Sequence, residues 1–145
     1  MEEKLNGLVI AKTDYGENDR IVKIFTLEKG TVSASMKGVK RAGAKLKFAS
    51  EPFCFAEFLF SERAGRRTVT GASLNDSFYP LREDTAKFFA AGTAIEFLRK
   101  FAREELTSPE LFFAAIECLK KIAYGGDTPR YALCRFLLSA LKITG

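Results

Sequence analysis

The residues with the clearest chemical potential form a basic segment that runs from Lys37 to Lys47, here called the basic loop. It contains no acidic residue and five cations: Lys37, Lys40, Arg41, Lys45 and Lys47. The chain of 145 residues has 23 Lys and Arg against 18 Asp and Glu, so these five equal the whole net charge of +5. Concentrated charge of one sign creates a local field that the net charge understates. Long cations between two glycines are suited to contact the phosphates of a polynucleotide.

Aromatic and further basic residues accompany the basic loop. Phe48 follows it directly and Tyr15 belongs to an earlier polar turn, and either ring could stack on a base. A second basic cluster in the next turn contains Arg63, Arg66 and Arg67, and Arg20 follows the polar turn. A plainer interpretation fits the same residues, because lysines often keep a hairpin soluble and aromatic rings often anchor loops. The sequence leaves both interpretations open.

Several classes of chemistry lack the residues that they need. The chain has no histidine, which excludes His-dependent triads and imidazole acid–base catalysis. Its three cysteines, Cys54, Cys118 and Cys134, form no Cys-x-x-Cys pair, so we expect three buried thiols and no metal site. Gly38 and Gly43 have the spacing of a P-loop, but the Lys-Ser/Thr pair does not follow. We therefore expect a non-enzymatic protein without catalytic residues or cofactors.

The first half of the chain predicts the strands that position these residues. Val32, Ala34 and Met36 alternate with polar neighbours between Thr31 and Lys37, which is typical of a half-buried strand. We expect four further short strands at 8–10, 20–26, 52–60 and 67–74, with a polar turn at 14–19. Five antiparallel strands without crossover helices most often close into a small barrel, of which the OB-fold is the common case. The sequence thus predicts an OB-fold domain over residues 1–80.

The second half changes to helical periodicity. Apolar residues from Phe88 to Ala102, including Phe101, recur at helical spacing. Ser108-Pro109-Glu110 is typical of a helix start, Gly125-Gly126 of an end, and Asp127-Thr128-Pro129 of another start. We expect a helical domain over residues 81–145. The predicted fold class is therefore α+β, a five-stranded OB-fold barrel followed by a helical bundle.

The composition agrees with a globular protein, because 47% of residues are hydrophobic and 28% are charged. No apolar run approaches the roughly 20 residues of a membrane span. Met1-Glu2-Glu3-Lys4 is not the basic start of a signal peptide. We expect a cytoplasmic protein with no membrane partner.

Several stretches resemble the amino-terminal part of RecO, a family of bacterial recombination mediators. The most specific combination joins Asp-Tyr-Gly-Glu-Asn-Asp-Arg at residues 14–20 to Lys-Gly-Val-Lys-Arg at residues 37–41. The other matching stretches are Val9–Thr13, Ile21-Val22, Phe25-Thr26, Gly30, Pro52-Phe53, Leu81–Asp84 and Pro109–Phe112. The resemblance runs through nearly the whole chain. Family members are longer and many carry a cysteine-rich zinc module, so we expect this chain to be a shortened member or a fragment.

The resemblance implies an amino-terminal OB-fold with a helical domain behind it, matching the fold that the residue pattern predicts. It implies binding of single- and double-stranded DNA, annealing of complementary strands and assembly with RecR. It also implies contact with the acidic-hydrophobic tail of single-strand-binding protein and help for RecA in displacing that protein. Carried across by position, the DNA-contacting cations would be Lys37, Lys40 and Arg41. Arg20 matches the motif and would either bind DNA or support the barrel.

Two functions of different classes follow. The first is a nucleoid-associated protein of bacterial recombinational DNA repair, which binds and anneals strands and helps to load the recombinase onto coated single-stranded DNA. The alternative is a protein-interaction adaptor whose helical half binds partner tails while the barrel is a scaffold. Phenylalanines beside Arg99, Lys100 and Arg103 would suit an acidic-hydrophobic peptide.

Overall fold

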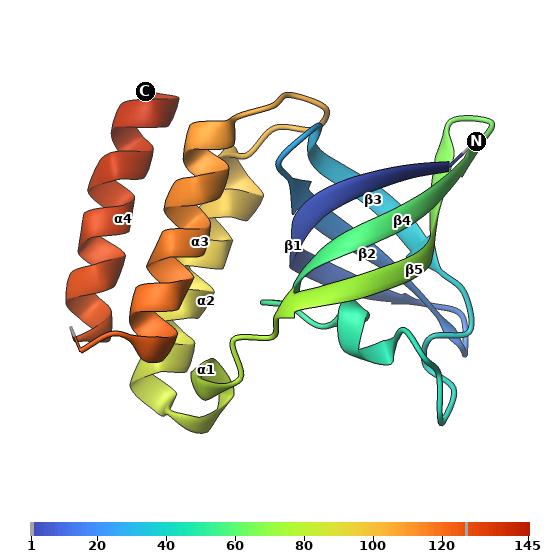
Figure 1. Cartoon of the computed structure of the whole chain (residues 1–145), viewed down its shortest axis with the longest axis horizontal. Helices are drawn as coiled ribbons and strands as arrows, with labels where there is room; N and C mark the ends of the chain where they lie inside the picture. Colours follow the sequence, from blue (N-terminus) through green and yellow to red (C-terminus); the bar gives the residue numbers. More distant parts are fainter. Residues whose placement is uncertain (1, 127) are drawn as a thin grey trace. The chain divides into compact units, whose positions relative to one another are not determined.

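The computed structural model describes residues 2–126 and 128–145 (Figure 1). The chain divides into two compact units. The barrel unit contains the residues up to Ser77 together with Arg103–Thr107, and the helical unit contains Phe78–Ala102 and Ser108–Gly145. Asp127, part of the third expected helix start, lies outside the described residues.

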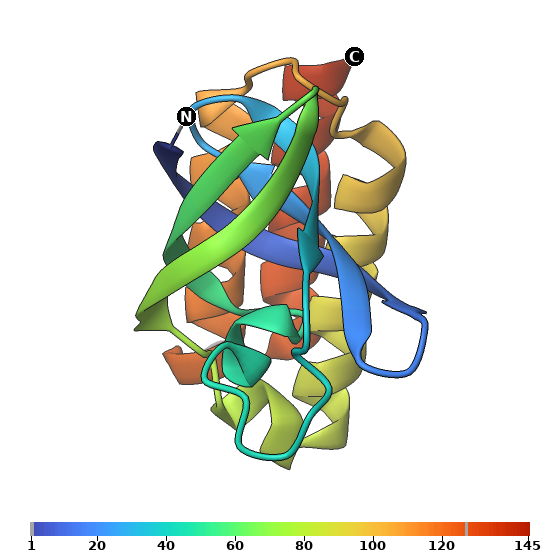
Figure 2. The same ribbon diagram turned by 90° about the vertical axis from the view of Figure 1, so that its right-hand side faces the viewer.

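The barrel unit is a closed sheet of five strands, in the order β1-β2-β3-β5-β4 (Figures 1 and 2). The strands are β1 (Glu2–Tyr15), β2 (Asp19–Thr26), β3 (Gly30–Met36), β4 (Phe55–Arg63) and β5 (Arg66–Asp76). The predicted barrel is confirmed. One detail is corrected, because β3 and β5 pair in parallel, with Ser35 opposite Thr68. An odd number of strands in a closed ring cannot alternate in direction throughout, so one pair must be parallel.

β1 is much longer than its apolar residues suggest. Residues 2–8 pair with β4 and residues 7–15 pair with β2, and the β1–β2 register shifts between Val9 and Ala11. Bulges of this kind bend a strand, which lets β1 serve two neighbours. The polar stretch that we expected to be a turn is partly strand, since Asp14 pairs with Arg20 and Tyr15 with Asp19. The turn itself is only residues 16–18.

The barrel core follows the expected alternation along β3. Val32, Ala34 and Met36 are buried, while Ser33 is exposed. Thr31 is also buried, contrary to the simple alternation. Its backbone N–H donates to the carbonyl of Arg103 at 3.2 Å, and its carbonyl accepts from the N–H of Glu105 at 3.1 Å. Residues 103–107, here called the strap, therefore pair with the start of β3 and cover Thr31.

The helical unit contains four helices: α1 (Pro80–Glu83), α2 (Thr85–Phe101), α3 (Pro109–Tyr124) and α4 (Pro129–Thr144). The side chain of Asp84 caps α2 by accepting from the N–H of Lys87 at 3.0 Å, and Thr128 caps α4 similarly. Phe88 and Phe101 are half exposed, although helical periodicity assigned them to the core. Ala91, Ala94, Ile95 and Leu98 form the buried face of α2, so the two rings lie at its edges.

The cysteine prediction holds for two of the three thiols. Cys54 and Cys118 are buried, and burial raises the pKa of Cys118 to about 12. Cys134 is exposed, so the expectation of a third buried thiol is wrong. It lies two residues before the buried Phe136 on α4, and a helix with 3.6 residues per turn places such residues on opposite sides.

Candidate nucleic-acid interface

The basic loop leaves β3 and ends in the short 3-10 helix η1 (Lys47–Ser50). Its first half is held against the β1–β2 turn by two backbone contacts. The N–H of Gly38 donates to Oδ1 of Asp19 at 2.7 Å, and the N–H of Lys40 donates to the carbonyl of Asn18 at 2.9 Å. Gly38 has φ of 69°, in the left-handed region that favours glycine. Val39 is buried in the barrel core and anchors the loop from inside.

Most cations of the basic loop are exposed. Within the described part of the chain, four of them have no ion-pair or hydrogen-bond partner for the side chain: Lys37, Arg41, Lys45 and Lys47. Lys40 differs, because its Nζ lies 3.1 Å from Oδ2 of Asp14 and its side chain is half buried. The loop thus presents four charges to solvent and keeps a fifth paired.

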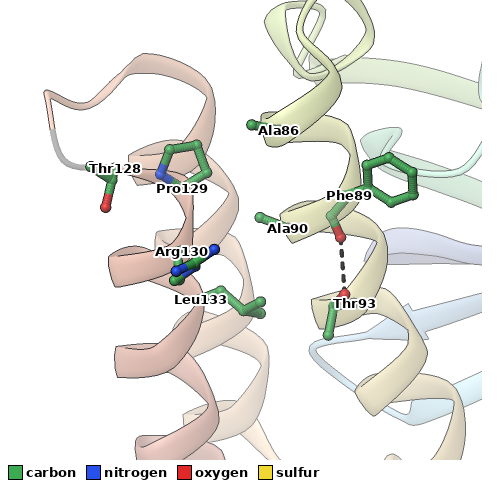
Figure 3. A pocket seen from close by; sticks show the side chains of 8 residues that line it. All are labelled: Ala86, Phe89, Ala90, Thr93, Thr128, Pro129, Arg130 and Leu133. Carbon is green, nitrogen blue, oxygen red and sulfur yellow. Dashed lines mark hydrogen bonds between the residues drawn. The ribbon is translucent and has the colours of Figure 1, made fainter.

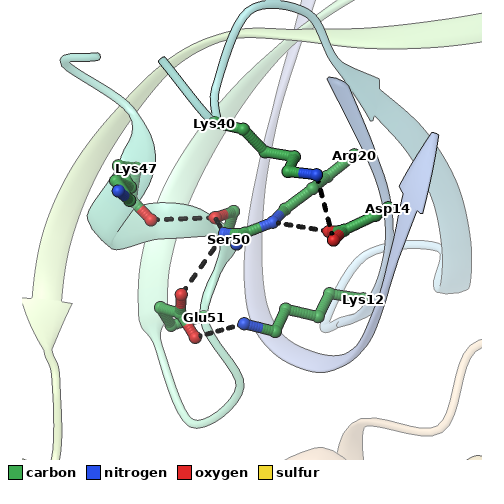
Figure 4. Close-up of polar contacts among 7 residues, drawn as sticks. All are labelled: Lys12, Asp14, Arg20, Lys40, Lys47, Ser50 and Glu51. Carbon is green, nitrogen blue, oxygen red and sulfur yellow. Dashed lines mark hydrogen bonds and ion pairs between the residues drawn. The ribbon is translucent and has the colours of Figure 1, made fainter. Parts of the chain in front are cut away.

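Arg20 lies in a network below the basic loop (Figure 4). Its Nε lies 3.1 Å from Oδ1 of Asp14, and its Nη1 donates to Oγ of Ser50 at 2.7 Å. A second ion pair joins the same Nη1 to Glu51, at 3.3 Å. The side chain is 11% exposed, so Arg20 ties the β1–β2 hairpin to η1. These contacts give Arg20 a structural role in the barrel unit, and its contact with DNA stays a prediction.

Acidic side chains in this network are held in their charged form. Hydrogen bonds from Lys40 and then Arg20 lower the pKa of Asp14 below its usual range. Burial acts to raise the pKa of Glu51, but the contacts with Lys12 and Arg20 outweigh it and leave this pKa lowered. Lys12 Nζ lies 2.8 Å from Oε2 of Glu51. Both carboxylates therefore remain negative at neutral pH beside the cations of the loop.

A groove of about 370 Å³ lies on the barrel surface between β3 and the β4–β5 turn, and the end of β1 and one residue of β2, Ile21, also line it. Its lining includes the small side chains Ser33 and Ser35, with Tyr15 and Arg66 among the larger residues. Tyr15 is 65% exposed. In an OB-fold, the face of strands 2 and 3 with the flanking loops is where oligonucleotides bind. The groove therefore has the position, the aromatic ring and the cation that a nucleic-acid site needs.

The groove and the basic loop are neighbours in the structure. Tyr15 pairs across the hairpin with Asp19, and the carboxylate of Asp19 binds the backbone of Gly38 at the start of the loop. Tyr15, which lines the groove, is therefore connected through Asp19 to the start of the basic loop. Phe48 is also exposed, but it belongs to η1 and does not line the groove.

The second basic cluster contains two very different arginines. Arg66 is exposed and has no ion pair within the described residues. Arg67 is 12% exposed and contacts three carboxylates, with Nη1–Oε1 of Glu105 at 2.6 Å, Nε–Oε1 of Glu3 at 2.8 Å, and Glu62 at 3.8 Å. Arg67 therefore connects β1, β4 and the strap, while Arg66 faces solvent at the rim of the groove.

Sequence reasoning missed these acidic partners. Glu3 and Glu105 are 64 and 38 positions from Arg67, so nothing in the basic cluster itself indicates them. Asp14 could have been found, because a hairpin that turns at Gly16 places it opposite Arg20. The DNA-binding role of the predicted residues stays a prediction, and the fold decides which of their charges are exposed and which are paired with carboxylates.

A second groove lies within the helical unit, between α2 and α4 (Figure 3). Its volume is about 530 Å³, and Ala90, Pro129 and Leu133 contribute apolar lining. Phe89 is 69% exposed at its edge, and Arg130 is a cation in the lining. The lining does not include Arg99, Lys100 or Arg103, which the sequence suggested for a peptide site.

Two other findings limit the chemistry of the described residues. No group of three acidic, cysteine or histidine side chains among them could hold a metal ion. None of the helices in the described part of the chain is long and apolar enough to cross a membrane.

Comparison with known proteins places the chain in a family. The model for the Recombination protein O N terminal family matches residues 1–78, and that for the C terminal family matches residues 82–145. A DNA repair protein RecO from Anaeromyxobacter sp. (strain K) is 34% identical over 144 residues, which are 98% of this chain and 56% of that protein. One from Bacillus subtilis (strain 168) is 30% identical over 127 residues, covering 88% of this chain and 50% of that protein.

A third relative, the DNA repair protein RecO of Bacillus pumilus (strain SAFR-032), is 31% identical over 124 residues, 86% of this chain and 48% of that protein. The chain thus spans about half the length of the curated relatives that it matches. Together the two family models cover the barrel and the helices, and the resemblance seen in the sequence is confirmed. This chain belongs to the RecO family of DNA repair proteins.

Proposed function

We propose that the barrel unit binds single- and double-stranded DNA through the phosphate backbone, with little sequence preference. The observation that carries this proposal is the set of exposed, unpaired cations on the basic loop: Lys37, Arg41, Lys45 and Lys47. Arg66 adds a fifth such charge at the rim of the neighbouring groove. Neutralising phosphates releases condensed counterions, which is the main source of non-specific affinity for DNA.

The proposed mechanism is electrostatic and needs no catalytic residue. Cations that bind the phosphates of two strands reduce the repulsion between the strands, so complementary bases can pair and anneal. Tyr15 in the groove and Phe48 beside the loop are placed to stack on unpaired bases, which would favour single strands. Lys40, Arg20 and Arg67 should contribute less than the other cations, because carboxylates already contact them.

The test is the salt dependence of binding to a single-stranded oligonucleotide. If five phosphates are engaged, log Kobs should fall with log[salt] at a slope of roughly −3.5. Changing Lys37, Arg41 and Lys45 together to alanine should make that slope shallower by about 2 and weaken binding equally for different sequences.

A matched control is the triple change of Lys100, Lys120 and Lys142 to alanine. These exposed lysines belong to the helical unit, and both triple variants lower the net charge from +5 by three. We expect this control variant to keep the wild-type slope of log Kobs against log[salt]. Equal losses in the two variants would instead indicate a general effect of net charge.

We extend the proposal to the wider role that the family resemblance suggests. In that role the protein assembles with RecR, contacts single-strand-binding protein, and helps RecA to replace that protein on single-stranded DNA. The measurement is RecA assembly on DNA coated with single-strand-binding protein, with and without this chain and RecR. Faster assembly that is lost in the Lys37, Arg41 and Lys45 triple variant would support it, and an unchanged rate would contradict it.

A second candidate function is favoured by the groove between α2 and α4. Its apolar lining with Arg130 suits a short peptide that carries both acidic and apolar side chains, as the adaptor hypothesis requires. A labelled peptide of that kind should bind, and Arg130→Ala should weaken binding about tenfold, equivalent to about 1.4 kcal/mol. Phe113→Ala, an exposed phenylalanine on α3, is the control and should leave binding unchanged. If the adaptor role were the only one, DNA binding would stay weak at low salt.

A further inference from the structure

Asp14 bridges two cations with its two carboxylate oxygens. Oδ2 lies 3.1 Å from Nζ of Lys40, and Oδ1 lies 3.1 Å from Nε of Arg20 (Figure 4). The Asp14 side chain is 54% exposed, so solvent reaches this bridge directly. Two oxygens of one anion that face a lysine and an arginine make the contacts that the free oxygens of a phosphodiester make in phosphate sites.

The two cations are held by groups other than Asp14. Arg20 is also bound by Ser50 and Glu51, so its guanidinium keeps its place if Asp14 moves away. The backbone of Lys40 is fixed by the carbonyl of Asn18, and Gly38 is fixed by Asp19. The anion between Lys40 and Arg20 can therefore be exchanged without rearranging the basic loop.

We propose that Lys40, with Arg20 behind it, forms a phosphate subsite that the carboxylate of Asp14 occupies in the free protein. A DNA phosphate would displace Asp14 and take over its contacts. Exposed ion pairs are weak and are screened by salt, so an anion with higher local charge can replace the carboxylate. The inference rests on the proposed function and adds a built-in competitor, which lowers the affinity of the barrel for DNA.

The experiment measures binding of an oligothymidylate to Asp14→Asn over a range of salt concentrations. Asparagine keeps the size of the side chain and an oxygen that accepts from Arg20, but it removes the charge. We expect binding about two- to fivefold tighter at low salt, as loss of one exposed ion pair allows. We also expect the slope of log Kobs against log[salt] to be more negative by up to about 0.7, because Lys40 then engages a phosphate in every complex, whereas Asp14 still holds it in part of the wild-type complexes.

Two variants separate this subsite from a general charge effect. Glu17→Gln removes an equal charge from the turn that follows β1, and Glu17 has no ion pair within the described residues, so the slope should stay at its wild-type value. In the Lys40→Ala background, Asp14→Asn should no longer change the slope, since the cation that it frees is missing.

The possible outcomes distinguish the inference from the function on which it rests. If the wild-type chain shows no salt-dependent DNA binding, the proposed function and the phosphate subsite are both contradicted. If it binds DNA but Asp14→Asn changes affinity and slope no more than Glu17→Gln does, only the subsite is overturned. Thermal unfolding of each variant checks the fold, and Asp14→Ser, which also removes the charge, should reproduce the gain if Asp14→Asn is unstable.

Discussion

The two basic segments of the barrel unit look alike in sequence and differ in the structure. The basic loop holds four exposed cations without carboxylate partners among the described residues, and only Lys40 is paired. At the start of β5, Arg67 is surrounded by three carboxylates while its neighbour Arg66 is exposed. A cluster of cations in a sequence therefore does not show which charges a ligand can reach.

The difference comes from the surroundings of each segment. Arg67 lies on a strand, where β1, β4 and the strap each bring one glutamate to it. The basic loop extends beyond the strands between β3 and η1 (Figure 2), so few elements can bring an acid to its tip. Arg67 is therefore expected to stabilise the barrel, whereas Arg66 and the exposed cations of the loop are expected to be available for binding.

The largest difference between the basic loop and the more crowded part of the barrel is expected in the stability effects of alanine at two glycines with similar φ angles. Gly30 has φ of 70° and Gly43 has φ of 77°, but a Cβ on Gly30 would clash with the backbone of Leu106 in the strap, whereas Gly43 has open space. Gly30→Ala should lower the free energy of unfolding by about 3 kcal/mol, and Gly43→Ala by only about 1 kcal/mol. Urea denaturation measures both, and equal losses would show that the strap does not pack against β3 in solution.

The next effect compares the two neighbouring arginines. Arg67→Ala removes the ion-pair partner of Glu105 and one of the two partners of Glu3, whose other partner is Lys29, so we expect a loss of about 1–2 kcal/mol in the free energy of unfolding. Arg66→Ala should change stability by less than about 0.5 kcal/mol. DNA affinity should show the opposite order, with the larger loss in Arg66→Ala. If Arg66→Ala were less stable than Arg67→Ala, the structural role assigned to Arg67 and the exposed role assigned to Arg66 would both be wrong.

A smaller effect is expected in the pH dependence of stability. Hydrogen bonds from Lys29 and then Arg67 lower the pKa of Glu3 below 4.5 in the folded protein. A lowered carboxyl pKa stabilises the fold above the pKa of the unfolded chain, and this contribution is lost as pH falls through the folded pKa. Glu3→Gln should therefore cost about 0.5–1 kcal/mol at pH 7 and progressively less below pH 4.5. A constant difference between the two proteins down to pH 2 would contradict this role of Glu3.

Much of the fold could be predicted because its signals are local. Alternation along β3 and helical spacing in α2 to α4 are visible in any short window, and they predicted the barrel and the helices. The long β1 was missed because residues such as Lys12, Thr13 and Asp14 give no apolar alternation; pairing with β2 makes them strand. The parallel β3–β5 pair and the strap were missed because they depend on backbone contacts between distant segments.

The candidate site was predicted in its residue types and only partly in its geometry. The run of cations from Lys37 to Lys47 needs no structure to be seen, but the pairing of Lys40 with Asp14 joins residues 26 positions apart. The groove depends on β3 lying beside the β4–β5 turn, so Tyr15 and Arg66 line the same groove only after the barrel closes. Such neighbours cannot be inferred from spacing in the chain.

The most direct test of the central claim is a lysine acetylation footprint with and without an oligothymidylate. DNA is expected to protect Lys37, Lys45 and Lys47 from the reagent. Lys29, which pairs with Glu3, and Lys100 on α2 should react at the same rate in both samples. Protection confined to the helices, or equal protection of all these amines, would contradict the assignment of DNA binding to the basic loop.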